Sequence, residues 1–250
     1  MAPTIHFVRH AQGFHNLSVE NEQLPDPDLT PLGLEQCAKL RASFPSHSLV
    51  KTLIASPIRR TLYTALHSFH PLPSDPSAPI IALDLIQEVS DSPCDVGTDV
   101  AKLKEEFPPE KVDFARVRDG WNDKKNKDSW SEPTTEKLTA RAKEARRVIR
   151  ELAGDGDHHV VVVTHGAIVH YITDDWADIP DDRATSWSNC ELRSFKFADP
   201  SGQDDDATLE ELPESLHART GQEYGPSKAD QRAMRALVQK RLAPELKSQA

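Results

Sequence analysis

Two histidines of the chain lie directly after short apolar runs, where a side chain could reach a ligand. His10 follows the run TIHFV together with Arg9, and His165 follows the run HVVVV. Histidine can act as an acid–base group and arginine can bind a ligand through several donors. Both positions are therefore candidate site residues.

Two further segments bring polar residues to the end of an apolar run. The segment SPIRR, residues 56–60, comes directly after KTLIA, and Glu88 comes shortly after IIALDLI. In an open parallel sheet, ligands bind beyond the carboxyl ends of the strands, so four such ends would open into one crevice. One histidine at a strand end is more often structural, but four polar strand ends in one chain favour a shared site.

The apolar runs that precede these residues predict strands, and helical patterns lie between them. The predicted strands are Thr4–Arg9, Lys51–Ala55, Ile80–Ile86, His159–Thr164 and Trp187–Phe197. The predicted helices are one that starts at Thr30-Pro31, Pro57–Phe69 and Thr134–Ala153. Strands that alternate with helices indicate right-handed βαβ crossovers and a mostly parallel sheet. The fold class is therefore α/β.

Length and composition restrict the class of protein further. The chain has 250 residues, 37 % of them hydrophobic, and no stretch approaches the roughly 18 consecutive apolar residues of a membrane span. A formal net charge of −10 argues against sequence-independent nucleic-acid binding. Three cysteines without a secretory signal are typical of a reducing compartment. We expect a cytoplasmic protein with a small substrate and neither nucleic acid nor membrane as partner.

Two segments fit the alternating pattern poorly. Residues from about 90 to 131 are polar and rich in Asp, Lys and Pro, which predicts a small insertion or lid. Residues from about 199 to 250 comprise an acidic tail and a closing helix from roughly Lys228 to Leu242. The predicted organisation is a single domain over residues 1–250 that carries these two additions.

Several other signatures are missing or stand in the wrong context. The chain has no P-loop motif, and no cysteine is followed by five residues and an arginine. The D-x-D-x-T string that begins at Asp26 follows the polar run ENEQLP instead of a strand, so we interpret it as a turn. His165 and His170 have no carboxylate or cysteine at ligand spacing. We therefore predict no metal site and no cofactor.

Five segments of the chain resemble, in the same order, the motifs of the histidine phosphatase superfamily in its phosphoglycerate-mutase-like branch. They are Val8-Arg9-His10-Ala11 with Asn16, Asp28-Leu29-Thr30 with Gly33, Ser56-Pro57-Ile58-Arg59-Arg60 with Thr64, Glu88, and Val163-Thr164-His165-Gly166. Ala11 replaces the family's usual glycine, and Tyr63 replaces a frequent glutamine. Neither change removes a group that the chemistry needs. The resemblance spans about residues 4–197 and implies a three-layer α/β/α sandwich.

The resemblance also implies a metal-independent phosphatase that works through a phosphohistidine intermediate. His10 would be the nucleophile, with one ring nitrogen held by a backbone carbonyl. Glu88 would protonate the leaving alcohol and then activate water, with Asp91 as the alternative acid. The residues implied to bind or stabilise the phosphoryl group are Arg9, Asn16, Arg60, His165 and Gly166. Arginine and histidine supply the positive charge that a metal would otherwise supply.

Spacing along the predicted helix distinguishes the two neighbouring arginines. Consecutive helical residues diverge by about 100°, so Arg59 and Arg60 cannot both face one pocket, and the family motif matches Arg60.

Two other functions remain open: a phosphoglycerate-type mutase and a non-catalytic module that binds a phosphorylated ligand. The mutase is disfavoured because no long substrate-binding insert is present. The binding module is disfavoured because all the reacting positions carry side chains that can do the chemistry. The sequence specifies neither the substrate nor the oligomeric state.

Overall fold

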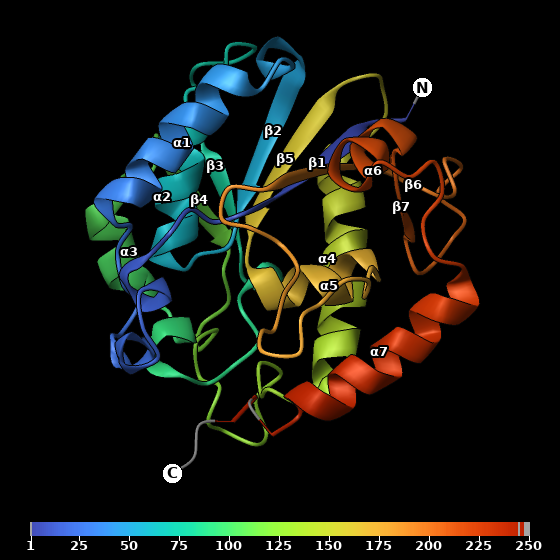
Figure 1. Ribbon diagram of the computed structural model, residues 1–250. Helices are drawn as coiled ribbons and strands as arrows, with labels where there is room; N and C mark the ends of the chain where they lie inside the picture. Colours follow the sequence, from blue (N-terminus) through green and yellow to red (C-terminus); the bar gives the residue numbers. More distant parts are fainter. Residues whose placement is uncertain (1, 245, 248–250) are drawn as a thin grey trace.

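A seven-stranded mixed sheet forms the centre of the computed structural model, which describes residues 2–244 and 246–247 (Figure 1). Its strand order is β4-β3-β2-β5-β1-β6-β7. The strands are β1 (Thr4–Arg9), β2 (Val50–Ala55), β3 (Ile80–Leu83), β4 (Val112–Arg116), β5 (His159–Thr164), β6 (Leu192–Phe197) and β7 (Leu209–Glu211). Helices pack on both faces, which confirms the predicted α/β sandwich.

The central strands are parallel, and this part of the prediction is confirmed in detail. β5 pairs in parallel with β1, with Phe7 opposite Val162, and in parallel with β2 on its other side. β6 and β7 are antiparallel additions beside β1. The four consecutive valines of β5 are fully buried because helices cover both faces of a parallel sheet, so every side chain of the strand is enclosed.

Helices cover the sheet in two groups. α1 (Pro31–Ser43), α2 (Arg59–Ser68) and α3 (Val100–Glu106) pack on one face, and α4 (Thr135–Ala153) and α5 (Gly166–Thr173) pack on the other. α6 (Pro213–Thr220) lies beside β6, and α7 (Lys228–Leu242) packs onto the layer of α4 and α5 (Figure 1). Among the described residues, no helix has the length and apolar character needed to cross a membrane.

The predicted strand Ile80–Ile86 is shorter in the structure than in the sequence prediction. The strand ends at Leu83, and Asp84–Ile86 form a 3₁₀ turn. The buried carboxylate of Asp84 explains the change of direction, because it accepts hydrogen bonds of 2.9 Å from the backbone and from the guanidinium group of Arg118. The turn brings Glu88 towards the carboxyl end of the sheet.

The predicted lid and tail are partly built into the sandwich. Within residues 90–131, α3 packs on the sheet and β4 pairs in parallel with β3, so these two elements belong to the sandwich. Within the acidic tail, β7 pairs with β6. A few buried apolar residues, such as Leu103 and Leu209, hold these charged segments in place. The helix predicted from Lys228 to Leu242 is confirmed as α7.

Candidate active site

A cavity of about 500 Å³ opens beyond the carboxyl ends of the central parallel strands. Six of the seven predicted site residues line it: Arg9, His10, Asn16, Arg60, Glu88 and Gly166. The seventh, His165, is fully buried and packs against His10, with ring centroids 5.3 Å apart. The alternative acid, Asp91, lines a neighbouring cavity instead. The fold therefore brings together residues that lie up to 157 positions apart in the chain.

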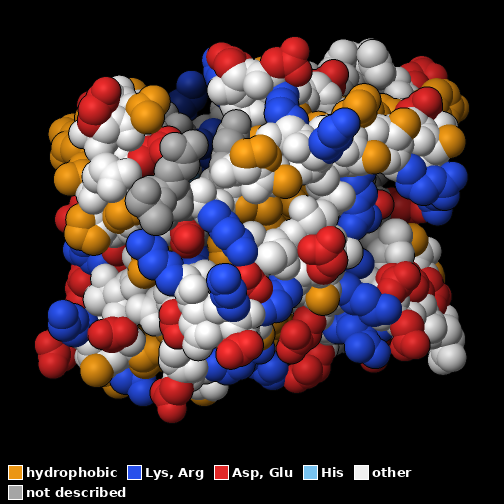
Figure 2. Space-filling view, turned by 90° about the horizontal axis from the view of Figure 1, so that it is seen from below, with side chains coloured by type: hydrophobic (Ala, Val, Ile, Leu, Met, Phe, Trp, Pro, Cys, Tyr) orange, Lys and Arg blue, Asp and Glu red, His pale blue; other side chains and the backbone are white. Residues whose placement is uncertain are grey.

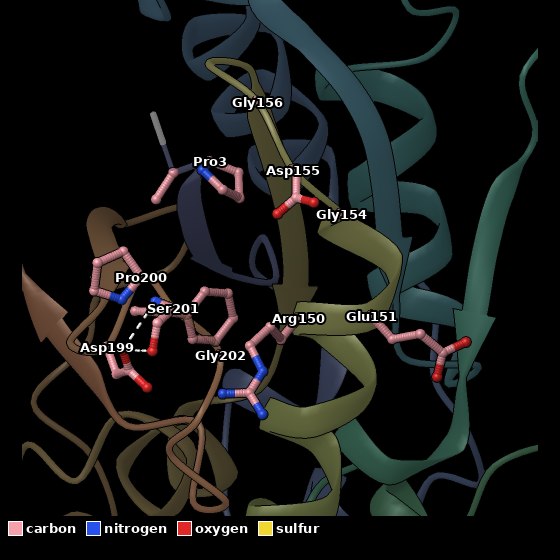
Figure 3. A pocket seen from close by; sticks show the side chains of 12 residues that line it. Pro3, Arg150, Glu151, Gly154, Asp155, Gly156, Asp199, Pro200, Ser201 and Gly202 are labelled. Carbon is pink, nitrogen blue, oxygen red and sulfur yellow. Dashed lines mark hydrogen bonds between the residues drawn. The ribbon is translucent and has the colours of Figure 1, made fainter.

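A second, larger cavity of about 760 Å³ lies at the opposite end of the sheet, where β1 begins and α4 ends (Figure 3). Among the described residues that line it there is no histidine, cysteine or lysine. Its Asp199 carboxylate accepts hydrogen bonds from Ser201 within one turn, and Arg150 donates to the carbonyl of Asp204. The charged groups of the larger cavity therefore stabilise loops. The smaller cavity, which the predicted site residues line, is the candidate active site.

The hydrogen bonding of His10 leaves one ring nitrogen available for chemistry. Its Nδ1 donates to the carbonyl of Ala11 at 2.7 Å, which places the proton on Nδ1 and leaves Nε2 with a lone pair. The Ala11 peptide is itself held by Thr64, whose hydroxyl accepts from the Ala11 N–H at 3.0 Å. Burial, and then the charge of Arg60, lower the pKa of His10 well below 6.5. The ring is therefore neutral near pH 7.

His165 presents a nitrogen that has no hydrogen-bond partner among the described residues. Its Nε2 lies 2.8 Å from the hydroxyl of Ser56, which also accepts the N–H of Ile58 and can donate its own hydrogen to the ring. Nδ1 is buried and unpartnered. Burial, and then the charge of Arg60, lower the pKa of His165 as well. A neutral ring that accepts from Ser56 carries its proton on Nδ1, where it can donate to a bound anion.

Arg60 faces the cavity and Arg59 does not. The Arg60 guanidinium is 1 % exposed, donates to the carbonyl of Cys94 at 2.6 Å and pairs with Asp95 at 2.8 Å. Arg59 instead pairs near the surface with Asp28 and Glu106, both at 2.8 Å. The orientation of the two arginines agrees with the divergence of consecutive residues on α2.

Arg9 approaches the first turn of α5 closely. Its guanidinium donates to the carbonyl of Trp187. A Cβ atom at Gly166 would lie 3.1 Å from Nε of Arg9 and 2.7 Å from Cγ2 of Thr185, so a side chain at Gly166 would displace its neighbours. Glycine is needed here for close approach.

Unpartnered buried nitrogen atoms gather around His10. Among the described residues, Nε of Arg9, Nε of Arg60, Nδ1 of His15 and Nδ1 of His165 are buried without a hydrogen-bond partner. Buried polar groups in native proteins are nearly always satisfied, so such a group of nitrogen atoms indicates a ligand that supplies acceptors. Two of the four belong to guanidinium groups, which makes an anion the matching ligand.

Glu88 lies at the N-terminus of α5. Its Oε1 accepts the N–H groups of Val89 and Ile168, both at 3.0 Å, and its Oε2 accepts that of Ala167 at 3.2 Å. Burial raises the pKa of Glu88, and the nearby carboxylate of Asp95 raises it further. The backbone donors of α5 oppose this effect without cancelling it. A carboxyl group with a raised pKa is suited to donate a proton.

Three cavity or support residues were missed by sequence reasoning. His15 lines the cavity and its ring lies 5.3 Å from that of His10. Asp95 also lines it, paired with Arg60 and with the hydroxyl of Ser90 at 2.6 Å. Although burial acts to raise the pKa of Asp95, the charges of Arg60 and Lys124 outweigh it and the pKa is lowered. His15, one residue before Asn16, is the only one that its position in the motif could have indicated.

The third missed residue, Lys124, supports the segment that carries Glu88 and Asp95. Its ammonium group is 1 % exposed and donates to the carbonyls of Glu88, Ser90 and Asp95 at 2.9, 2.9 and 2.6 Å. Arg141 adds hydrogen bonds to the carbonyls of Gln87 and Glu88. Burial lowers the pKa of Lys124 to about 7.

Replacing Lys124 by methionine should lower kcat/KM for a phosphate monoester by roughly 10- to 100-fold. The change leaves three carbonyls without their common donor, and small displacements of catalytic groups have effects of that size. The matched control is Lys125→Met, because Lys125 is exposed and adjacent. Steady-state kinetics and thermal unfolding of both variants test this; equal kcat/KM values for the two would contradict a supporting role for Lys124.

The D-x-D-x-T string has a structural role. The carboxylate of Asp26 accepts the N–H groups of Arg59 at 3.0 Å and Thr98 at 2.8 Å, and Asp26 does not line the active-site cavity. Its backbone has a positive φ of 41°, as in a turn. Within the part of the chain that the structure describes, no group of three or more His, Cys, Asp or Glu side chains is placed to hold a metal ion.

The α/β sandwich and a cavity lined by histidine and arginine side chains are features that a phosphoryl-transfer class of protein would have. The chain belongs to the histidine phosphatase superfamily (branch 1), whose family model matches residues 5–204. A phosphoglycerate mutase-like protein of Arabidopsis thaliana is 28 % identical over 236 residues, 78 % of this chain and 84 % of that protein. A probable phosphatase of Schizosaccharomyces pombe is 32 % identical over 109 residues, 42 % of this chain and half of that protein.

Solved structures share the fold at low sequence identity. The ecdysone phosphate phosphatase of Bombyx mori, in complex with tungstate, is 16 % identical with a TM-score of 0.58, over 90 % of this chain and 94 % of that chain. A phosphoserine phosphatase mutant of Entamoeba histolytica, in complex with phosphoserine, is 14 % identical with a TM-score of 0.51, over 84 % and 95 % of the two chains. At these identities the comparison establishes the common fold.

Proposed function

We propose that the protein is a phosphatase that hydrolyses a phosphate monoester through a phosphohistidine on His10 and without a metal ion. The observation that carries this proposal is the group of unpartnered nitrogen atoms around a neutral histidine with a free Nε2. A phosphate monoester offers acceptor oxygens to those nitrogen atoms and a phosphorus atom to Nε2. Phosphoryl transfer then depends mainly on positioning and charge stabilisation.

In the first step, Nε2 of His10 attacks phosphorus while the bond to the leaving oxygen breaks. Glu88 gives its proton to that oxygen, so the alcohol leaves neutral and Glu88 becomes a carboxylate. Arg9, Arg60 and His165 donate to the oxygens of the transferring group, which carry the developing charge. Asn16 and the backbone at Gly166 complete the proposed binding set.

In the second step, a water molecule replaces the departed alcohol. The carboxylate of Glu88 takes a proton from this water as its oxygen attacks phosphorus, and the bond from phosphorus to Nε2 breaks. Inorganic phosphate leaves, and both His10 and Glu88 return to their starting protonation states. The raised pKa of Glu88 suits this alternation, because its carboxyl group must be an acid in one step and a base in the next.

A phosphoglycerate-type mutase is the second candidate, favoured by the names of the relatives in Arabidopsis. A mutase returns the phosphoryl group to another position of its substrate instead of to water. The phosphatase is preferred because the partial match in Schizosaccharomyces pombe is described as a probable phosphatase. The two solved structures compared above are phosphatases as well.

The purified protein should release inorganic phosphate from p-nitrophenyl phosphate, with a rate unchanged within about twofold by 5 mM EDTA. The reason is that arginine and histidine supply all the positive charge in the proposed mechanism. The assay is run in parallel on 3-phosphoglycerate with detection of both phosphate and 2-phosphoglycerate. Isomerisation without phosphate release would identify a mutase, and binding without turnover would identify a binding module. Loss of activity in EDTA that added metal restores would contradict the proposed mechanism.

A further inference from the structure

The proposed acid, Glu88, marks the side of the cavity where the alcohol of the substrate must lie. A general acid works only within hydrogen-bond reach of the leaving oxygen, so the carbon body of the alcohol extends from a point next to its carboxyl group. Of the residues whose backbone N–H groups donate to this carboxyl group, Val89 and Ala167 line the cavity. Both have apolar side chains, and the inference that follows rests on the proposed phosphatase function.

The C-terminal part of the chain continues this apolar wall. Leu242, at the end of α7, and Leu246 line the cavity together with Ala184. The Leu246 carbonyl accepts the N–H of Asp91 at 3.2 Å, which attaches it to the segment that follows Glu88. Leu246 also belongs to the same hydrophobic cluster as Val89 and Ala167. The pattern of the sequence predicts only an acidic tail and a closing helix at this end of the chain.

A segment that lines one side of the cavity also carries exposed apolar side chains. The segment 14–24 contributes His15, Asn16 and Glu22 to the cavity. The same segment carries four of the nine exposed large hydrophobic side chains of the described residues: Phe14, Leu17, Val19 and Leu24. Figure 2, which views the molecule from below, shows hydrophobic side chains in groups between charged ones of both signs. The segment 14–24 beside the cavity therefore exposes apolar side chains to solvent.

We propose that the substrate is the phosphate monoester of an alcohol with an apolar body. The cavity of about 500 Å³ is within the usual range for small-molecule sites and has room for more than a phosphoryl group. An apolar body that leaves water against Val89, Leu242 and Leu246 gains the hydrophobic contribution. Hydroxyl groups of a polyol that lie against these three side chains would lose water without gaining hydrogen bonds from them.

Two synthetic esters of equal length test this inference on the unmodified protein: n-heptyl phosphate and 2-(2-methoxyethoxy)ethyl phosphate. The second replaces two methylene groups of the first by ether oxygens. Each methylene group that leaves water contributes about fourfold to affinity. We expect kcat/KM to be at least about tenfold higher for the heptyl ester, and to rise with chain length among alkyl phosphates until the cavity is filled.

Variants of the wall locate the preference. Leu246→Ala should reduce the ratio of the two kcat/KM values by about fivefold or more, whereas Leu237→Ala should leave it unchanged. Leu237 is the matched control because it lies on α7, is 70 % exposed and does not line the cavity.

The outcomes separate this inference from the proposal on which it rests. Equal rates for the two esters, or a preference for the ether, would overturn the apolar substrate and leave the phosphatase intact. No hydrolysis of these esters or of p-nitrophenyl phosphate would overturn both. A normal ratio in a folded Leu246→Ala variant would exclude the C-terminal wall as the cause of the preference.

Discussion

Replacing His10 by alanine should lower kcat for every phosphate monoester by on the order of 10⁴-fold or more. The variant loses the only protein group in the proposed mechanism that bonds to phosphorus, and loss of a nucleophile has effects of this size in other enzymes. Rapid-quench labelling with a ³²P-labelled substrate should give a phosphoenzyme in the wild type and none in the variant. The label should be acid-labile and stable to base, as expected for phosphohistidine.

The control for this experiment is His67→Ala. His67 is exposed on α2, the helix that also carries Arg60, and does not line the cavity. It should keep wild-type kcat and wild-type labelling. A base-labile label that survives in the His10 variant would contradict the assignment and would point instead to an acyl phosphate, for which Asp26 is the candidate in the D-x-D-x-T string.

Replacing Glu88 by glutamine should slow the hydrolysis of alkyl phosphates by roughly 10²- to 10⁴-fold, the usual contribution of general acid–base catalysis. Cleavage of p-nitrophenyl phosphate should slow much less, provided that dephosphorylation of His10 is not limiting. An alkoxide is a poor leaving group and needs the proton of Glu88, whereas p-nitrophenolate leaves without one. The measurement is kcat/KM for both substrates with both proteins.

The pH dependence provides a second readout for Glu88. Burial raises its pKa, so the acid form extends to higher pH than for an ordinary glutamate. Above that pKa the proton is lost, and the wild-type rate on alkyl phosphates should fall there while the rate on p-nitrophenyl phosphate falls less. His10 has a lowered pKa, so its protonation should not limit the rate near pH 7.

Asp91→Asn is the matched control for Glu88→Gln. Asp91 lies three residues further along the chain and lines a neighbouring cavity, so its replacement should not produce the substrate-selective loss. If the selective loss appears in Asp91→Asn and is missing in Glu88→Gln, then the acid is misassigned and the phosphatase itself still stands.

Much of the fold was predictable because buried parallel strands have a distinct sequence pattern. The predicted strands Thr4–Arg9 and His159–Thr164 coincide with β1 and β5. Strands enclosed on both faces need continuous apolar side chains, and that need is visible without knowledge of the partner strand. The edge strand β4 escaped prediction because only Val112 and Phe114 of its five residues are buried, which leaves a short and mixed pattern.

The residues of the candidate site could be expected to lie together where they follow those strands. The carboxyl ends of parallel strands meet at one edge, so order along the chain is enough to expect Arg9, His10, Glu88 and His165 in one crevice. Helix geometry showed that only one of the two neighbouring arginines could face the pocket, and the resemblance to the family motif selected Arg60. These conclusions depend on interactions within a few residues of each position.

Only the tertiary structure distinguished Lys124 from Lys125. The carbonyl groups that Lys124 binds lie 29 to 36 positions earlier in the chain, and nothing in the sequence around either lysine reflects them. The same holds for Asp95, which acquires its role from Arg60, and for Leu246, which reaches the cavity from the end of the chain. The periodicity of a sequence records which faces are buried. The partner that a buried charge or a terminal leucine meets is decided by chain segments far away in sequence.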